Sequence, residues 1–600
     1  MAAGISIIEV MSRKTKKDVG ALVRGSGVSF RVWAPFAHSV AVSGSFNDWA
    51  EHPLESENDG YWAVFVEGAE PGQEYKFVIK NGDNVYHRND PRALHFTTTP
   101  GNAVIASSNF DWEDDAFTPI PLEEQVIYEL HVGTFNRPDP AIIGTFQDMC
   151  DKLDHLAGLG VNMIEVMPIG SMLMDRGWGY AIDYIYAVES LYGGRHGFLQ
   201  FVKAAHKRGI GIILDVVYNH FGPDENLDLW QFDGWQENGK GGIYFYNDWR
   251  AETPWGSTRP DFGREEVRQY LLDNVKMWLE DCRVDGLRFD STIYIRNVKG
   301  YNNDPSNDLP EAWSLLQQAN ELSKKINPAA LTIAEDVADN EYIVKPTSEG
   351  GAGFVSQWEL GFPHSLREAL HSNNPADINL SELMTQLTRR FIDNPFSRII
   401  YIDSHDTAAN GSARFNEVIS PDAADNLFAR RQSLIAAALL FTTPGIPMLF
   451  QGEEFMESGS FSDWQSLDWD KAVKHAGIVQ AHADLIALRK NAGGVSAGLT
   501  GCDINIMHFD EDNKVIAYHR WKKGGPADDV VVIVNFGDKL HVEYLLGLPR
   551  NGNWRVRFNS TAKAYSPDFK EAGVAEVMVE NGTASIVLPP ASVLILSQDK

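Results

Sequence analysis

Residues 286–290, Gly286-Leu287-Arg288-Phe289-Asp290, are the stretch around which the fold of this chain is organised. An apolar run leads into an arginine and, two residues later, into a carboxylate. On a β-strand, residues i and i+2 point to the same side, so Arg288 and Asp290 are predicted to face together at the end of a buried strand. A neighbouring arginine keeps a carboxylate ionised, as a nucleophile at neutral pH requires. Taken alone, the stretch is more typical of a structural Arg–Asp pair.

Seven further apolar stretches in the middle of the chain also predict buried strands. The eight predicted strands are residues 126–132, 161–167, 209–217, 284–290, 331–335, 354–360, 399–403 and 448–451. Helical spacing is clear between several of them, at residues 146–159, 266–280 and 423–441. Strands that alternate with helices are typical of parallel sheets. Eight such units predict an α/β fold, a (β/α)8 TIM barrel over residues 123–495.

Both ends of the chain show the two-residue alternation of β-strands. Residues 20–105 and 497–600 each predict a small β-sandwich, since alternating runs are separated by turn residues such as Asn58-Asp59-Gly60. Residues 106–122 are acidic, contain proline and lack periodicity, so we interpret them as a linker. Residues 221–261 form a long loop inserted in the barrel, rich in Gly, Trp and Asp, and loops of that length are usually functional.

Composition limits the classes of partner and the compartment. The net charge is −30, which disfavours nucleic acid and anionic membranes but is compatible with a neutral polysaccharide. The three cysteines, Cys150, Cys282 and Cys502, lie far apart, which argues against a disulfide framework. Residues 1–17 show no secretion signal, and no uncharged run is long enough for a membrane helix. We therefore expect a soluble, monomeric, cytoplasmic protein.

Polar residues gather where the predicted barrel strands end. They are Asp215, Asn219 and His220 after the third strand, Arg288 and Asp290 after the fourth, Glu335 after the fifth, and His405 and Asp406 after the seventh. In barrels of this type the carboxyl ends of the strands share one mouth, where active sites lie. Four charged strand ends are hard to explain by packing, because each buried charge needs a partner.

Retaining glycosyl transfer fits this set of residues. One carboxylate attacks the anomeric carbon, a second protonates the leaving oxygen, and the two lie about 5 Å apart. Asp290 is the predicted nucleophile because Arg288 holds it charged, and Glu335 is the predicted acid/base. Asp406 would bind sugar hydroxyls and favour the distorted ring, while His220 and His405 would donate hydrogen bonds to hydroxyls.

The same residues carry a resemblance to a known family. Asp215-Val-Val-Tyr-Asn-His220, Gly286 to Asp290, Ile333-Ala-Glu-Asp336 and Ser404-His-Asp406 resemble, in order, the four signature regions of glycoside hydrolase family 13, the α-amylase family. Trp178-Gly-Tyr180 resembles the family's sugar-stacking tyrosine. The resemblance implies that Asp290 is the nucleophile, Glu335 the acid/base and Asp406 the transition-state stabiliser. It also implies a substrate-binding role for residues around the cleaved sugar, here Tyr180, Asp215, His220, Arg288 and His405.

Other stretches bear on which member of the family this is. Gly44-Ser-Phe-Asn-Asp-Trp49, with Trp33 before it, resembles carbohydrate-binding module family 48, although these tryptophans are as compatible with simple core packing. A module of this kind, a barrel and a C-terminal sandwich form the layout of 1,4-α-glucan branching enzymes, which is the function we expect. Asp215 to Pro223 and Thr253-Pro-Trp-Gly256 instead resemble maltooligosyltrehalose trehalohydrolase. An α-1,4-glucan hydrolase of that or the α-amylase type is therefore the alternative, and a non-catalytic glycan-binding protein is the second.

Acceptor choice and metal binding are the least determined properties. Trp230, Trp235, Trp249 and Trp255 in the long loop could form acceptor platforms or simply pack within it. Asn219 and the acidic loop beyond it are compatible with the calcium site of many α-amylases. However, Asp and Asn in loops more often form turns, so we expect neither a metal nor another cofactor.

Overall fold

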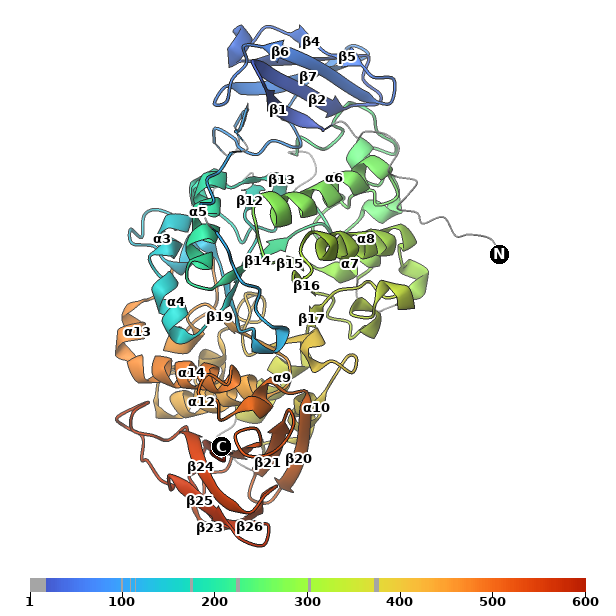
Figure 1. Cartoon of the computed structure of the whole chain (residues 1–600). Helices are drawn as coiled ribbons and strands as arrows, with labels where there is room; N and C mark the ends of the chain where they lie inside the picture. Colours follow the sequence, from blue (N-terminus) through green and yellow to red (C-terminus); the bar gives the residue numbers. More distant parts are fainter. Residues whose placement is uncertain are drawn as a thin grey trace.

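The computed structural model describes residues 18–98, 101–107, 109–113, 115–172, 176–222, 227–300, 304–371 and 377–600. The molecule is elongated, with a β-rich domain at each end and a barrel between them (Figure 1). Residues 1–17, where we expected no secretion signal, lie outside the described residues. Among the helices that the structure describes, none is long and apolar enough to cross a membrane.

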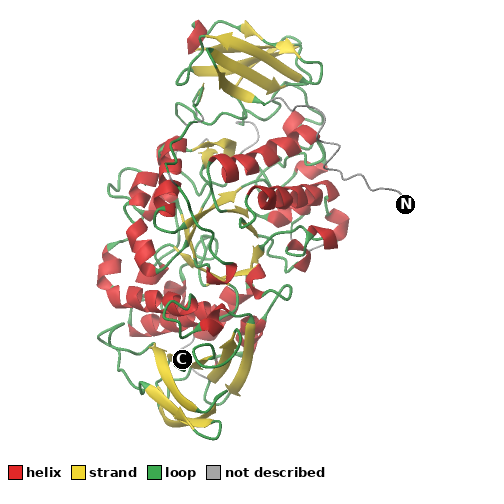
Figure 2. Cartoon of the chain, in the orientation of Figure 1, coloured by secondary structure: helices red, strands yellow, loops and turns green. Residues whose placement is uncertain are grey.

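The middle of the chain closes into a barrel of eight parallel strands, with helices around the outside (Figure 2). The strands are β10 (Ile127–Leu130), β11 (Met163–Val166), β14 (Gly211–Val216), β15 (Gly286–Phe289), β16 (Leu331–Ala334), β17 (Ser356–Trp358), β18 (Arg398–Tyr401) and β19 (Ile446–Phe450). Every residue of these strands is buried, which explains their continuous apolar runs. Each strand overlaps a predicted one, so the predicted (β/α)8 barrel is confirmed.

The helices around the barrel differ from the predicted ones at their ends. They include α3 (Phe146–Cys150), α4 (Leu153–Leu159), α5 (Gly194–His206), α6 (Glu265–Lys276), α8 (Pro310–Ile326), α9 (Gly361–Leu370), α10 (Ser381–Thr388), α12 (Leu427–Thr442) and α14 (Ala476–Arg489). The helix predicted over residues 146–159 is divided in two, and a π turn extends α6 to Asp281. Helix α12 begins later than predicted because Asn426 caps it, accepting the N–H of Ala429 at 2.8 Å.

Two loop regions rise above the carboxyl ends of the strands. The first is a hairpin of β12 (Gly170–Met172) and β13 (Ile182–Val188), which the sequence analysis did not predict. The second is the long loop predicted over residues 221–261, whose described part contains only short 3-10 turns. Arg259 is fully buried and anchors this loop, since its guanidinium donates to the carbonyls of Glu252 at 2.8 Å and Val298 at 2.9 Å.

The N-terminal domain consists of two small sheets packed face to face. One contains β1 (Gly20–Arg24), β2 (Gly27–Trp33), β6 (Tyr61–Glu67) and β5 (Glu55–Ser56), and the other β4 (His52–Pro53), β3 (Ser39–Gly44), β7 (Glu74–Asn81), β8 (Asn84–Arg88) and β9 (Ala103–Val104). Trp33 is buried in this domain and Trp49 is exposed. The domain also holds the long loop: Phe36 stacks on Trp235 with ring centroids 4.6 Å apart, and Arg88 donates to the carbonyl of Trp230 at 2.9 Å.

The C-terminal domain is the predicted second sandwich. Its larger sheet has the order β20 (Asp503–Asp510), β21 (Val515–Trp521), β22 (Val530–Asn535), β27 (Ser592–Ser597), β24 (Gly552–Asn559) and β25 (Glu576–Val579), and β23 (His541–Gly547) pairs with β26 (Thr583–Leu588). Its own core includes the fully buried Trp554. The barrel flanked by β domains at both ends therefore agrees with the predicted fold class.

Candidate active site

One buried guanidinium lies at the centre of the barrel mouth. Arg288 is fully buried, and its Nη1 contacts Asp215 Oδ2 at 2.6 Å and Asp290 Oδ1 at 2.9 Å, while its Nη2 contacts Glu335 Oε2 at 2.6 Å. Its Cζ also lies 4.5 Å above the ring centroid of Trp358. Three carboxylates from three neighbouring strands therefore share a single cation.

The strand register and one unusual turn produce this arrangement. Asp215 on β14 lies opposite Arg288 on the adjacent parallel strand β15. Just after β15, Ser291 adopts a left-handed conformation with φ of 41°, which is uncommon for a residue other than glycine. The turn directs the Ser291 N–H to Glu335 Oε2 at 2.8 Å. The backbone after Asp290 thus helps to hold the carboxylate that ends the next strand.

A second set of contacts lies beside this centre. The hydroxyl of Tyr180 donates to Asp215 Oδ2 at 2.7 Å and lies 2.9 Å from Nε2 of His405, and the two rings stack with centroids 5.2 Å apart. Nε2 of His405 also lies 3.5 Å from Asp406 Oδ2. On its other side, Nδ1 of His405 lies 2.5 Å from Glu129 Oε1.

His220 lies next to the long loop. Its ring stacks on Trp255 with centroids 4.5 Å apart and an interplanar angle of 19°, and its Nδ1 has no hydrogen-bond partner among the described residues. The preceding residue, Asn219, donates from its amide to Asp290 Oδ2 at 3.0 Å. All eight predicted site residues therefore lie in one mouth. Their predicted roles stay predictions.

Burial and charge act in opposite directions on the titratable groups. Burial raises the pKa of the Asp290 and Glu335 carboxyls, and the Arg288 guanidinium opposes that rise. Burial lowers the pKa of His405, but the Asp406 and Glu129 carboxylates outweigh it and raise that pKa to about 10. Burial and a nearby arginine lower the pKa of His220 to about 3. At neutral pH one histidine of the mouth is cationic and the other neutral.

Family models match most of the chain. The alpha amylase catalytic domain matches residues 130–228 and 223–485, carbohydrate-binding module 48 (isoamylase N-terminal domain) matches residues 18–93, and the alpha amylase C-terminal all-beta domain matches residues 506–599. The chain belongs to the α-amylase family. The resemblance inferred from its sequence motifs is thereby confirmed.

Relatives within the α-amylase family carry a more specific name. The 1,4-alpha-glucan branching enzyme GlgB of Corynebacterium glutamicum is 30% identical over 585 residues, covering 92% of this chain and 77% of that protein. The branching enzyme of Oceanobacillus iheyensis is 30% identical and covers 89% of this chain and 86% of its own length. The pullulanase of Anoxybacillus sp. LM18-11 complexed with maltotetraose shares the fold, with a TM-score of 0.76 at 19% identity, covering 99% of this chain and 89% of that one.

Sequence reasoning missed two groups in this α-amylase-family site. Glu129 on β10 contacts both the ring and the main chain of His405, and Trp358 on β17 lies against Arg288. Both stand inside stretches predicted as strands. The signal for Glu129 was a lone acidic residue within an apolar run, since a buried charge implies a partner.

The four tryptophans of the long loop divide into two kinds. Trp230 and Trp235 are half-buried and contact the N-terminal domain, so packing explains them. Trp249 and Trp255 are 62% and 46% exposed, and Trp255 lies at the mouth against His220. Only the exposed pair is available as a platform for sugar.

The predicted absence of a metal and the calcium alternative both stay untested. Among the described residues, no three or more His, Cys, Asp or Glu side chains gather as a metal site. Asn219 directs its amide at Asp290, and residues 223–226 of the acidic loop lie outside the described residues.

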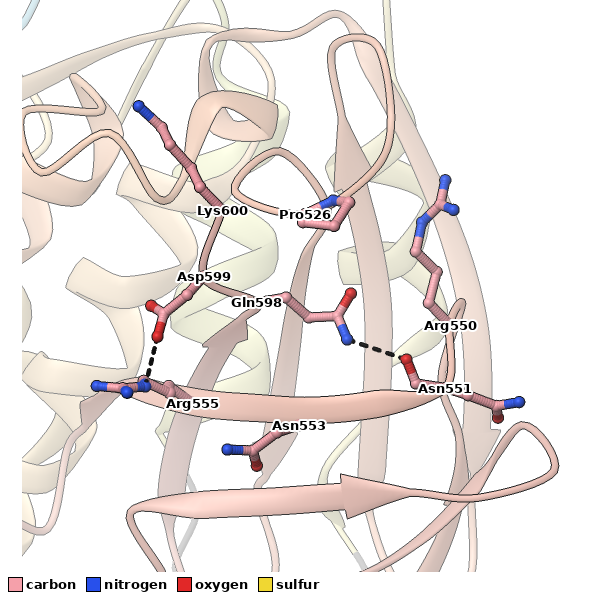
Figure 3. A pocket seen from close by; sticks show the side chains of 8 residues that line it. All are labelled: Pro526, Arg550, Asn551, Asn553, Arg555, Gln598, Asp599 and Lys600. Carbon is pink, nitrogen blue, oxygen red and sulfur yellow. Dashed lines mark hydrogen bonds and ion pairs between the residues drawn. The ribbon is translucent and has the colours of Figure 1, made fainter.

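Two open cavities lie away from the barrel mouth. One of about 580 Å³ is in the C-terminal domain, where Arg550, Asn553, Arg555 and Gln598 line it (Figure 3). Its arginines are paired with acids, for example Arg555 with Asp599 at 2.7 Å. The other, of about 550 Å³, lies between the segment around Phe110 and the start of α5.

Proposed function

We propose that this protein is a 1,4-α-glucan branching enzyme, which cleaves an α-1,4 linkage and transfers the freed chain to a 6-hydroxyl with retention of configuration. The observation that carries the chemistry is the pair of carboxylates, Asp290 and Glu335, held by one guanidinium. Retaining enzymes hold their two carboxyls about 5 Å apart, a separation that one guanidinium can bridge. The choice of branching rests on relatives of that name that align over most of both chains.

Hydrogen bonding supports different roles for the two carboxyls. Both oxygens of Asp290 accept N–H donors, Oδ1 from Arg288 and Oδ2 from Asn219, and hydrogen bonds of this kind favour the ionised form. Glu335 accepts both of its donors, from Arg288 and Ser291, on Oε2, which leaves Oε1 to carry a proton. Two adjacent buried carboxyls share protons as a unit, so one ionised and one neutral member is the stable combination. Asp290 is the nucleophile and Glu335 the acid.

The reaction then proceeds in two balanced steps. In the first, a carboxylate oxygen of Asp290 bonds to the anomeric carbon while the bond from that carbon to O4 breaks, and Glu335 delivers its proton to O4. In the second, Glu335 takes the proton of an acceptor 6-hydroxyl, whose oxygen bonds to the anomeric carbon and releases Asp290. Water in place of the acceptor would give hydrolysis, so water must be kept from the intermediate.

The remaining groups bind the sugar at the cleavage point. Tyr180, stacked on His405, presents an aromatic face, and the two ring nitrogens of cationic His405 contact Glu129 and the Tyr180 hydroxyl. Asp406, whose side chain is 44% exposed, is available to sugar hydroxyls and to the positive charge of the transition state. Neutral His220 can exchange hydrogen bonds with a hydroxyl without adding charge.

The acceptor chain is placed against Trp255. Its ring contacts His220 and has an edge contact with Tyr294, with centroids 5.1 Å apart. Tyr294 belongs to α7 (Thr292–Arg296), which begins directly after Ser291, the residue whose N–H binds Glu335. These contacts connect Trp255 through α7 to the turn that binds Glu335, and they support an acceptor chain on the acid/base side.

The test is incubation of purified protein with amylose, following α-1,6 linkages by proton NMR together with new reducing ends. A branching enzyme produces α-1,6 signal with few new reducing ends. Reducing ends that rise without α-1,6 signal would make the protein a hydrolase, and a maltooligosyl-trehalose substrate would be tried next. No change in either, with glucan still bound, would indicate a non-catalytic glycan-binding protein.

We also propose that the protein is a monomer in the cytoplasm. Its three cysteines are free, which fits a reducing compartment. Light scattering coupled to size exclusion measures the oligomeric state directly.

A further inference from the structure

The carboxylate of Glu129 contacts His405 at two points. Its Oε1 lies 2.5 Å from Nδ1 of the ring, and its Oε2 accepts the main-chain N–H of His405 at 3.1 Å. Its own carbonyl accepts the N–H of Gln451 at 2.9 Å. The carboxylate is almost completely buried, so the contact is desolvated and its geometry is fixed. Glu129 thus connects β10 to two segments, the one after β18 that contains His405 and the one after β19 that contains Gln451.

Counting hydrogen atoms around Tyr180 determines the protonation of His405. The Tyr180 hydroxyl has one hydrogen, and it is donated to Asp215 at 2.7 Å. Toward Nε2 of His405, 2.9 Å away, the same oxygen can only accept. Nε2 therefore carries a hydrogen. Nδ1, facing the Glu129 carboxylate, carries another, so the ring is an imidazolium.

That imidazolium depends on its surroundings. The titratable and charged groups around it are Asp406 on its own segment, Glu129 and His131 from β10 and the turn after it, Glu165 on β11, Tyr180, Arg288 on β15 and Glu335 after β16. Arg288 disfavours a second positive charge, whereas burial lowers the pKa of His131 to about 4, so that ring is neutral. Of the carboxylates, only Glu129 is bonded directly to a ring nitrogen at hydrogen-bond distance and is itself buried.

We propose that Glu129 is a positioning residue that keeps His405 protonated on both nitrogens and aimed at Tyr180 and Asp406, so that the sugar-binding groups are in place before substrate arrives. Without its charge, His405 would lose a proton at a lower pH, and the Nε2 lone pair would then face the Tyr180 oxygen, whose hydrogen is already given to Asp215. The two lone pairs would repel each other and separate the stacked rings. Catalytic use of this arrangement rests on the function proposed above, whereas the protonation of His405 does not.

Neutralising Glu129 gives the kinetic test. In Glu129→Gln we expect kcat on amylose, counted as all glycosidic bonds broken or transferred, to fall on the order of 10²-fold. A loss of about 10⁴-fold is known where the oriented imidazole itself transfers the proton. We expect a smaller loss here because His405 only donates hydrogen bonds. The alkaline limb of the pH profile should move down by about one unit, since one of the two carboxylates that raise the pKa of His405 has been neutralised while Asp406 remains.

Glu454→Gln is the matched control. Glu454 is fully buried and also bonds a histidine, with Oε1 2.8 Å from Nε2 of His155, and it accepts the hydroxyl of Tyr128. These contacts lie outside the sugar-binding groups, so we expect activity within threefold of wild type and an unchanged pH profile. An equal loss in both variants, or a wild-type pH profile in Glu129→Gln, would reduce Glu129 to a structural residue and overturn the proposal.

An NMR measurement on the wild-type chain keeps the proposal testable if Glu129→Gln does not fold. Selective 15N-histidine labelling, with His405 assigned from its absence in His405→Gln, should show two protonated ring nitrogens up to about pH 9, given a pKa of about 10. Titration of His405 near pH 6.5 would overturn the proposal. This readout is independent of whether the enzyme branches, hydrolyses or only binds glucan, so it separates failure of this inference from failure of the proposed function.

Discussion

Replacing Arg288 by lysine tests whether the shape of the guanidinium, beyond its charge, sustains the chemistry. The arginine spans three carboxylates with two nitrogens, at 2.6, 2.9 and 2.6 Å. An ammonium is a point charge on a flexible stem and cannot bridge the same atoms. Hydrogen bonds to charged groups contribute about 1.5–3 kcal/mol each. Losing two of the three costs about 3–6 kcal/mol, or about 10²- to 10⁴-fold in rate.

The companion variant Arg288→Gln separates charge from shape. Arg288 opposes the burial that raises the pKa of Asp290, so its loss lets that pKa rise further. Asp290, the proposed nucleophile, is then ionised only at higher pH, and the acid limb of kcat/KM moves upward. Arg288→Lys keeps the charge, so its acid limb should move less while its rate falls.

The assay is the pH dependence of kcat/KM on amylose for both variants, with thermal melting to confirm that each is folded. Activity of Arg288→Lys within tenfold of wild type, together with an unmoved acid limb in Arg288→Gln, would refute the reasoning. Arg288 would then be a packing residue whose carboxylate contacts do not support turnover.

Three further variants extend the test. Asp290→Asn should lower turnover by about 10⁵- to 10⁶-fold, as removal of a nucleophile does, while glucan binding in native affinity gels is retained. Trp255→Ala removes an exposed ring worth about 0.5–1.5 kcal/mol, so the ratio of α-1,6 transfer to hydrolysis should fall about 2- to 10-fold without a change in melting temperature; an unchanged ratio would exclude Trp255 from the acceptor site. Glu165 has one buried oxygen without a hydrogen-bond partner among the described residues, and burial raises its pKa well above the usual value. The folded state therefore binds a proton that the unfolded chain releases, so stability falls as pH rises, and the melting temperature of Glu165→Gln minus that of wild type should grow from pH 5 to pH 8.

Position along the strands was enough to predict which side chains meet at the barrel mouth. Asp290, Glu335 and Asp406 each follow an apolar run closely, and parallel barrel strands bring such ends together whatever the intervening loops do. Arg288 and Asp290 were predicted to face together from their two-residue spacing, and they do, at 2.9 Å. Local pattern determines these features, so a single sequence is sufficient.

Partners supplied by barrel closure could not be predicted in the same way. Glu129 and His405 are separated by 276 residues, and their contact exists only because β10 pairs with β19 to close the ring. Asn219 was noticed as a strand-end residue, yet its donation to Asp290 depends on how the backbone after β14 bends. No local pattern encodes either contact, since each is set by the relative placement of strands.

In the proposed mechanism, the fate of the intermediate on Asp290 depends on structure beyond the catalytic groups, because branching and hydrolysis use the same carboxylates. Trp255, proposed for the acceptor side, belongs to the long loop that the N-terminal domain holds through the stacking of Phe36 on Trp235 and the hydrogen bonds from Arg88. A module that resembles a carbohydrate-binding domain thus also braces the loop next to the intermediate. Weakening this contact should change the ratio of transfer to hydrolysis while the reaction at Asp290 continues, because it alters how water and acceptor reach the site.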